Sequence, residues 1–233
     1  MIADANRPGL CARGEPDCQP LFDEYLQSLL TASRPKARRI ASSALARSVQ
    51  VQDVYDTLLW PTVDRLDYLS RTDAIDQADY DLAIRIHRQV CDQVAAHLPA
   101  GPAQGKRAVL TCGGSESGEL AGQLVVDRLE AEGWEVYFLG GGVPCDEVLQ
   151  LIGRVRPNVL VIFATRTAEL PQVRRLIDTV RSVNACPDMS VLVGGGVFNR
   201  ADDLPHLIGA DDFAPTIRGV LDAVAHRQPA LAG

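Results

Sequence analysis

The spacing of apolar residues changes once along this chain, close to residue 100. From Pro20 to Leu98 apolar residues recur every three or four positions, which is typical of amphipathic helices. We expect four helices there: over residues 21–30, over residues 36–47, from about residue 51 with apolar positions up to residue 66 on one face, and over residues 76–98. Pro61 falls inside the third pattern and predicts a bend or a break, because proline lacks the backbone N–H of a helix interior. Helices of this length with short connections predict a small four-helix bundle.

After a linker rich in Pro, Gly and Ala, short apolar runs alternate with helical patterns. The runs predict strands at residues 107–112, 135–139, 158–163, 190–193 and 212–214. The intervening patterns predict helices at residues 117–132, 145–155, 170–184, 201–208 and 216–225. Strict alternation of strands and helices predicts an α/β fold, a five-stranded parallel doubly wound sheet of Rossmann or flavodoxin type.

These patterns predict two domains and short flanking segments. The expected parts are a flexible leader at 1–19, a helical bundle at 20–98, a linker at 99–105, an α/β domain at 106–226 and a tail at 227–233.

Composition narrows the function classes. The 233 residues are 46% hydrophobic and carry a formal net charge of −7, which argues against a nucleic-acid surface because phosphate binding needs clustered Lys and Arg. The one dense basic stretch, residues 34–39, is interpreted as a solvated helix face. No apolar run approaches the ~20 residues that span a bilayer, and the six cysteines are scattered, which predicts reduced thiols in a cytoplasmic protein.

Glycine turns follow the predicted strands where a doubly wound sheet binds its ligand, at the carboxyl ends of the strands. These turns fall at residues 113–114, 140–142, 164–167 and 194–196. The turn after the first strand lacks the order of a dinucleotide or P-loop motif, and Glu116 and Glu119 would repel phosphate. We interpret it as a strand-to-helix turn with Ser115 or Ser117 as the N-cap.

Two stretches carry a family resemblance. Residues 132–144, E-G-W-E-V-Y-F-L-G-G-G-V-P, are similar to a-G-F-E-V-x-D-L-G-x-x-V-P of the cobalamin-binding modules in methionine synthase, corrinoid methyl-carrier proteins and cobalamin-dependent photoreceptor regulators. Residues 191–199 and 208–215 are similar to v-G-G-x-x-F-N and l-G-A-D-x-x-A of the same family. The resemblance spans residues 20–225 and implies a helical cap, a Rossmann-like cobalamin-binding domain and a cofactor site between them.

The chain departs from the motifs that bind cobalt in this family. The family motif D-x-H-x-x-G, whose histidine is the lower cobalt ligand, falls on residues 116–121, with Glu116 at the aspartate and Gly118 at the histidine. Glycine offers no imidazole nitrogen, so the resemblance implies a corrinoid site without a protein histidine below the metal. The serine that contacts the nucleotide base is matched by Phe163, which would fill space that the nucleotide tail needs.

The bundle also departs from the photoreceptor members, in which a tryptophan and a Glu-His pair cover the upper face of the corrin. Counting from Pro61 places Ser70 at the tryptophan and Tyr80 at the start of the Glu-His pair, with Tyr68 as the nearest ring. His87 is either a lone axial ligand or a partly exposed helical histidine, and we favour the second. Arg166 is expected to pair with a carboxylate, either a tetrapyrrole propionate or Glu116.

Together the turns and the resemblance imply a cofactor site. Its expected residues are Glu116, Ser117, Gly118, Gly142, Val143, Phe163, Thr165, Arg166, Gly194, Gly195, Tyr68 and Tyr80.

The function that follows is a sensor or regulatory module that binds a corrinoid or a related tetrapyrrole, haem or bilin included. Two alternatives stay open, a ligand-free interaction scaffold whose old site Phe163 fills, and a corrinoid methyl-carrier subunit. No Ser/His/Asp, Cys/His or paired-carboxylate arrangement falls on adjacent strand ends, which favours a binding protein over an enzyme. The expected partners are the tetrapyrrole and a second protein or a second copy, with no direct contact to nucleic acid or membrane.

Overall fold

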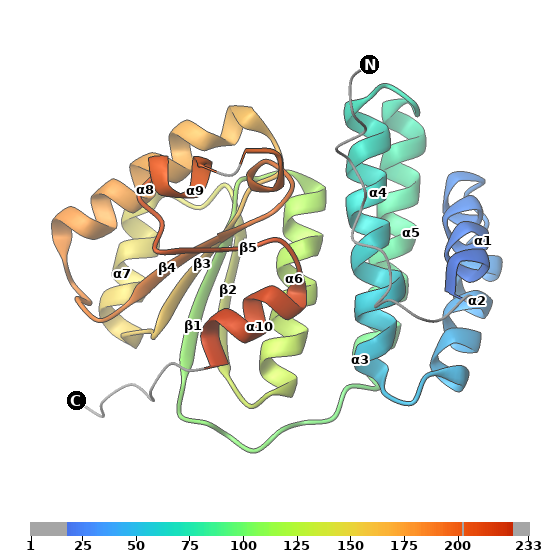
Figure 1. The fold of residues 1–233 in the computed structure, drawn as a ribbon, viewed down its shortest axis with the longest axis horizontal. Helices are drawn as coiled ribbons and strands as arrows, with labels where there is room; N and C mark the ends of the chain where they lie inside the picture. Colours follow the sequence, from blue (N-terminus) through green and yellow to red (C-terminus); the bar gives the residue numbers. More distant parts are fainter. Residues whose placement is uncertain (1–17, 202, 226–233) are drawn as a thin grey trace. The chain divides into compact units, whose positions relative to one another are not determined.

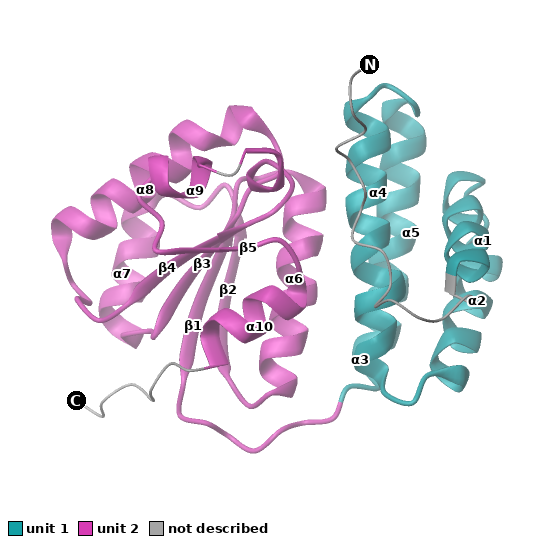
Figure 2. Ribbon diagram, in the orientation of Figure 1, with its two compact units in different colours: residues 1–98 teal, residues 99–233 magenta. Residues whose placement is uncertain are grey.

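The computed structural model describes residues 18–201 and 203–225. The chain divides between Leu98 and Pro99 into two compact units, coloured teal and magenta in Figure 2. The expected leader lies outside the described residues up to position 17, and the first helix already begins at Cys18. None of the described helices is long and apolar enough to cross a membrane.

The first unit is the expected four-helix bundle (Figure 1). Its helices are α1 (Cys18–Leu30), α2 (Arg34–Arg47), a long third helix, and α5 (Gln77–Ala95). The third helix consists of α3 (Val51–Val54), the π-helical turn η1 (Tyr55–Leu59) and α4 (Trp60–Arg71).

Pro61 neither breaks nor ends the third helix, which runs on to Arg71. The backbone widens instead, and the N–H of Trp60 donates to the carbonyl of Tyr55, five residues earlier. A π turn next to a proline accommodates the hydrogen bond that the missing N–H cannot make. The helix therefore continues at the cost of one irregular turn.

The second unit contains the predicted five-stranded parallel sheet. Its strands are β1 (Arg107–Cys112), β2 (Glu135–Gly141), β3 (Val159–Phe163), β4 (Ser190–Gly194) and β5 (Asp212–Ala214). Their order in the sheet is β2-β1-β3-β4-β5, the flavodoxin-like order. The order reverses between β1 and β3, and a ligand of such a sheet binds beyond the carboxyl ends of the strands at that point.

Helices cover both faces of the sheet (Figure 1). They are α6 (Glu116–Ala131), α7 (Cys145–Val155), α8 (Leu170–Val183), α9 (Leu204–Leu207) and α10 (Ile217–Ala225), with short 3-10 turns η2 (Thr167–Glu169) and η3 (Phe198–Arg200). The expectation of one helix over residues 201–208 was wrong. Ala201 is extended, with φ −150°, and Pro205 is tolerated only in a first helical turn.

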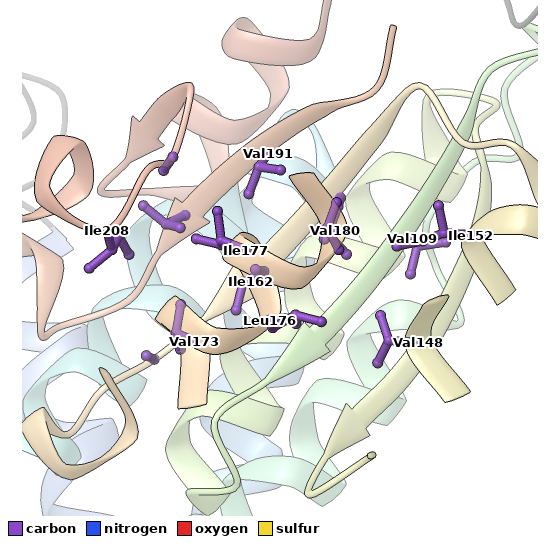
Figure 3. Packing of buried hydrophobic residues seen from close by; sticks show 14 of the residues in the cluster. Val109, Val148, Ile152, Ile162, Val173, Leu176, Ile177, Val180, Val191 and Ile208 are labelled. Atoms are coloured by element: carbon purple, nitrogen blue, oxygen red, sulfur yellow. The ribbon is translucent and has the colours of Figure 1, made fainter. Parts of the chain in front are cut away.

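The core on one face of the sheet packs α7 and α8 against the central strands (Figure 3). Val148 and Ile152 of α7 and Ile177 of α8 lie against strand residues such as Val109 and Ile162. Each fully buried side chain of this kind contributes roughly 1.5–3 kcal/mol. Alternate strand residues face the other side, where α6 packs, and there Cys112, Phe163 and Gly194 are neighbours across three strands.

Candidate functional site

The carboxyl ends of the strands carry turns whose backbone requires glycine. Gly114, Gly140, Gly142 and Gly195 have φ angles of 107°, 71°, 73° and 101°, a region that side chains with a Cβ disfavour. These turns follow β1, β2 and β4, as the sequence predicted. They form the edge of the second unit where a ligand of this sheet would bind.

Helix α6 begins immediately after the turn of β1. Ser115 is its N-cap, and the Ser115 hydroxyl accepts from the N–H of Gly118 at 3.3 Å. Gly118 therefore lies in the first helical turn rather than in a loop. A Cβ at Gly118 would lie 2.8 Å from Oγ of Ser115, so a larger side chain would need a shift of that hydroxyl.

A carboxylate that sequence reasoning missed joins the turns of β1 and β3. Glu169 is 9% exposed, and its Oε1 accepts from the N–H of Ser115 at 3.1 Å. Its Oε2 accepts from the N–H groups of Thr165 at 2.8 Å and Arg166 at 3.1 Å. The signal in the sequence was an acid at the third position of a short helix, where it satisfies the unpaired N–H groups at the helix start.

Hydroxyl groups cluster beside this carboxylate. Oγ of Ser115 lies 2.8 Å from Oγ1 of Thr165, and Oγ of Ser117 lies 3.4 Å from the same atom. Arg200 donates to the backbone carbonyl of Thr165 at 2.8 Å. All three hydroxyl residues are buried, so the structure brings two predicted site residues, Ser117 and Thr165, together in a closed polar network.

A second carboxylate holds the turn of β2. Glu119 accepts from the N–H of Gly141 at 3.0 Å, and a Cβ at Gly141 would lie only 2.5 Å from Cα of Gly114. The two glycine turns therefore touch through their backbones. At Gly142 an added Cβ would meet nothing within 4 Å, and both Gly114 and Gly142 are exposed. We call the backbone of residues 114 and 140–142 the glycine ledge; it is exposed at Gly114 and Gly142 and half-buried at Gly140 and Gly141. Val143 beside it packs partly into the core.

The glycines after β4 serve the packing of the protein itself. Phe163 is 0% exposed, and a Cβ at Gly194 would lie 2.8 Å from Cε1 of its ring. A Cβ at Gly195 would lie 2.3 Å from the carbonyl oxygen of Ala164. The ring of Phe163 thus fills the space that Gly194 leaves, as the sequence suggested.

Glu116 and Arg166 are exposed on the rim of this edge. Within the described part of the chain no ion pair joins them, so the expected pairing of Arg166 with Glu116 is not formed. The carboxylate that Arg166 does contact is that of Glu169, through its backbone N–H. Its side chain is exposed at the carboxyl end of β3.

The predicted aromatic residues lie on different helices of the first unit. Tyr68 on α4 is half-buried, with the guanidinium groups of Arg65 and Arg71 at 5.1 and 5.6 Å from the centre of its ring. Tyr80 on α5 is 2% exposed and follows the same helical stripe as His87. A role of either tyrosine toward a ligand stays a prediction.

His87 is not the partly exposed histidine that the sequence suggested. It is 0% exposed; its Nδ1 lies 2.8 Å from the hydroxyl of Tyr25, and its Nε2 lies 3.1 Å from the carbonyl oxygen of Leu59. A carbonyl only accepts, so Nε2 carries the proton and the Tyr25 hydroxyl donates to Nδ1. Burial lowers the pKa of His87 to about 4. Because both ring nitrogens are engaged inside the bundle, the alternative of an axial metal ligand is wrong for this arrangement.

The described residues contain no group of three or more His, Cys, Asp or Glu side chains that could hold a metal ion.

Comparison with known proteins bears on the second unit. Residues 106–224, just over half of the chain, match the family model of the B12 binding domain. Dimethylamine corrinoid protein 2 of Methanosarcina mazei is 29% identical over 121 residues, which are 51% of this chain and 56% of that protein. Dimethylamine corrinoid protein 1 of the same organism is 28% identical over 140 residues, 59% of this chain and 62% of that protein. The chain thus spans less than two thirds of either relative.

One solved structure shares the fold across both units. The monomethylamine corrinoid protein of Methanosarcina barkeri matches with a TM-score of 0.76 and 18% identity, over 89% of this chain and 98% of that chain. At this identity the likeness shows the fold, an N-terminal helical region followed by the parallel α/β sheet.

Proposed function

Because the chain belongs to the B12-binding domain family, we propose that it is a corrinoid-binding protein whose second unit holds the cofactor at the carboxyl edge of the sheet. The observation that carries this proposal is the glycine ledge. Two turns touch there through their backbones, and Gly114 and Gly142 are exposed, with open space at Gly142. A flat macrocycle can approach such a backbone closely, whereas a surface with side chains would hold it away.

The residues fit a corrinoid in one respect and depart from the family in another. Arg166 and Glu116 stand exposed beside the ledge, and they can bond the amide side chains of a corrin ring. Gly118 offers cobalt no donor, and the N-cap hydroxyl of Ser115 occupies the space beside it. A bound corrinoid would supply a cobalt that carries an alkyl group, while this chain would supply the surface and the rim contacts.

The finer proposal is a corrinoid carrier rather than a sensor. The relatives are named dimethylamine corrinoid proteins, which favours the methyl-carrier alternative. In such a role this chain would present the cofactor to a partner enzyme that performs the methyl transfer. The sensor interpretation stays a prediction without an observation in its favour, and neither haem nor bilin gains support from the family match.

A ligand-free scaffold is the second candidate, and one specific observation favours it. Phe163 and Ser115 fill with protein atoms the spaces beside Gly194 and Gly118, so those glycines need no ligand to explain them. The two candidate functions differ in whether a ligand binds at the glycine ledge, where no protein atom would lie within 4 Å of a Cβ added at Gly142.

Retention of a corrinoid tests the proposal. The purified chain is mixed with hydroxocobalamin, methylcobalamin, haem or biliverdin and passed through a gel-filtration column. We expect retained corrinoid absorbance at near-equimolar ratio. Arg166→Ala should weaken binding, and Arg175→Ala, which removes an exposed arginine of α8, is the matched control. A colourless eluate with both corrinoids would leave the scaffold as the function.

A further inference from the structure

We infer that Glu119 makes the glycine ledge select corrinoids whose peripheral side chains end in neutral amides over forms whose side chains end in carboxylates. The inference rests on the proposed corrinoid binding and names a specificity-determining residue of that same site. It concerns the edge of the ring and not its metal. A binding site selects between two such ligands when it repels one of them as well as attracting the other.

The carboxylate of Glu119 lies directly beside the ledge. Glu119 belongs to the first turn of α6, and its Oε1 accepts the N–H of Gly141 at 3.0 Å. The same oxygen would lie 3.5 Å from a Cβ at Gly140. Within residues 18–201 and 203–225 the other oxygen, Oε2, takes part in no hydrogen bond, and the side chain is half-buried. A carboxylate with an unused oxygen thus borders the backbone that a flat ring would approach.

No lysine or arginine compensates this charge in the two segments that form the ledge. Residues 111–127, from the end of β1 into α6, and residues 138–153, from β2 into α7, contain neither. They do contain further exposed carboxylates, Glu116 in the first turn of α6 and Asp146 and Glu147 in the first turn of α7. The N-terminal end of a helix favours an anion by itself, but both first turns here already carry negative charge.

Positive charge at this edge of the sheet follows the other strands. Arg166 comes after β3 and Arg200 after β4, and both are exposed. The sheet order places β1 and β2 on one side of the point where it reverses, and β3 and β4 on the other. A primary amide both donates and accepts, so it can donate to Glu119 and accept from an arginine. A carboxylate only accepts, and beside Glu119 it meets a like charge.

Titration of the full chain with two base-free corrinoids tests the inference. Cobinamide carries amides around the ring and cobyrinic acid carries carboxylates at the same positions, so the two probes share the ring and the metal. We expect cobinamide to bind roughly tenfold or more tightly at neutral pH, and the ratio to shrink as salt screens the charges. Equal affinities, or tighter binding of the acid, would overturn the inference while corrinoid binding stands. Binding of neither probe would also overturn it, and a parallel titration with hydroxocobalamin shows whether the proposed function fails as well.

Three variants assign the selectivity to Glu119. Glu119→Gln keeps an oxygen for the N–H of Gly141 but removes the charge, so the affinity for cobinamide should persist and the ratio of affinities should fall by about threefold. Glu119→Ala also removes the bond to the ledge and should weaken binding of both probes. Glu132→Gln, at the exposed C-terminal end of α6, is the control and should change neither affinity. An unchanged ratio in Glu119→Gln would show that its charge does not select the ligand, and that Glu119 only supports the fold.

Discussion

The imidazole of His87 is shielded from water and is held neutral by its surroundings, which makes the bundle sensitive to acid. Burial is the main reason that its pKa falls from 6.5 to about 4, and the positive charge of Arg88 adds to it, while the hydrogen bond to the Leu59 carbonyl acts in the opposite direction. The unfolded chain takes up a proton as the pH falls through 6.5, whereas the folded chain does so only near pH 4.

The direction in which stability changes with pH follows from the difference in the pKa of His87 between the folded and the unfolded chain. Above pH 6.5 both states hold His87 neutral, and its contribution to stability is complete. Between pH 6.5 and pH 4 only the unfolded state gains the proton, so the free energy of unfolding decreases. A difference of about 2.5 pKa units corresponds to about 3 kcal/mol, from 1.36 kcal/mol for each unit.

Urea unfolding measures the contribution of His87 to the free energy of unfolding. The native chain and His87→Gln are compared between about pH 7.5 and about pH 4, a range that includes the ~6.5 pKa of free histidine. Glutamine keeps a donor and an acceptor but does not titrate. We expect the native chain to lose about 3 kcal/mol more than the variant over this range. His97→Gln, a change at an exposed histidine, should follow the native chain. Equal pH dependence of the native chain and His87→Gln would refute the reasoning.

Two further predictions concern the ligand edge. Glu169→Gln places an amide N–H against the N–H of Ser115 and should lower the free energy of unfolding, measured with denaturant, by roughly 1–3 kcal/mol. Glu147→Gln, on the exposed face of α7, is the control and should leave this free energy almost unchanged. An unchanged unfolding midpoint in Glu169→Gln would contradict the structural role of Glu169. Gly194→Ala should lower the free energy of unfolding by roughly 1–3 kcal/mol, because the new Cβ overpacks against Phe163. Adding Phe163→Leu should recover only part of this loss, because the carbonyl of Ala214 also lies 3.1 Å from the new Cβ. Additive losses in the double-mutant cycle would contradict the contact between residues 163 and 194.

The architecture was predictable because it depends on periodicity, which a single sequence displays. Strand β1 was predicted to the residue, and β2 ended two residues later than expected because its last two glycines pair with Thr111 and Cys112 of β1. The helix predicted over residues 201–208 failed, because a run of apolar residues around Pro205 has helical spacing without the freedom to form a helix.

The interior of the candidate site was less predictable, since it depends on contacts between distant residues. Ser117, Gly118 and Thr165 were selected from the resemblance, and the structure places them together. Glu169 was not selected, because it lies 54 residues from the Ser115 whose N–H it accepts, and only the sheet order brings β1 beside β3. His87 was misjudged for the same reason, because the partners that bury it come from α1 and η1.

The missing histidine and the early start of α6 are two aspects of one local change. The resemblance aligns position 118 with the family's lower cobalt ligand, and here that position lies on a helix. In this chain Gly113 and Gly114 alone separate β1 from the N-cap Ser115, so position 118 is already helical and faces the hydroxyl of Ser115 and the methyl group of Thr165. Restoring a histidine at position 118 would therefore not restore a cobalt ligand, because the short turn and its cap would have to be lengthened first.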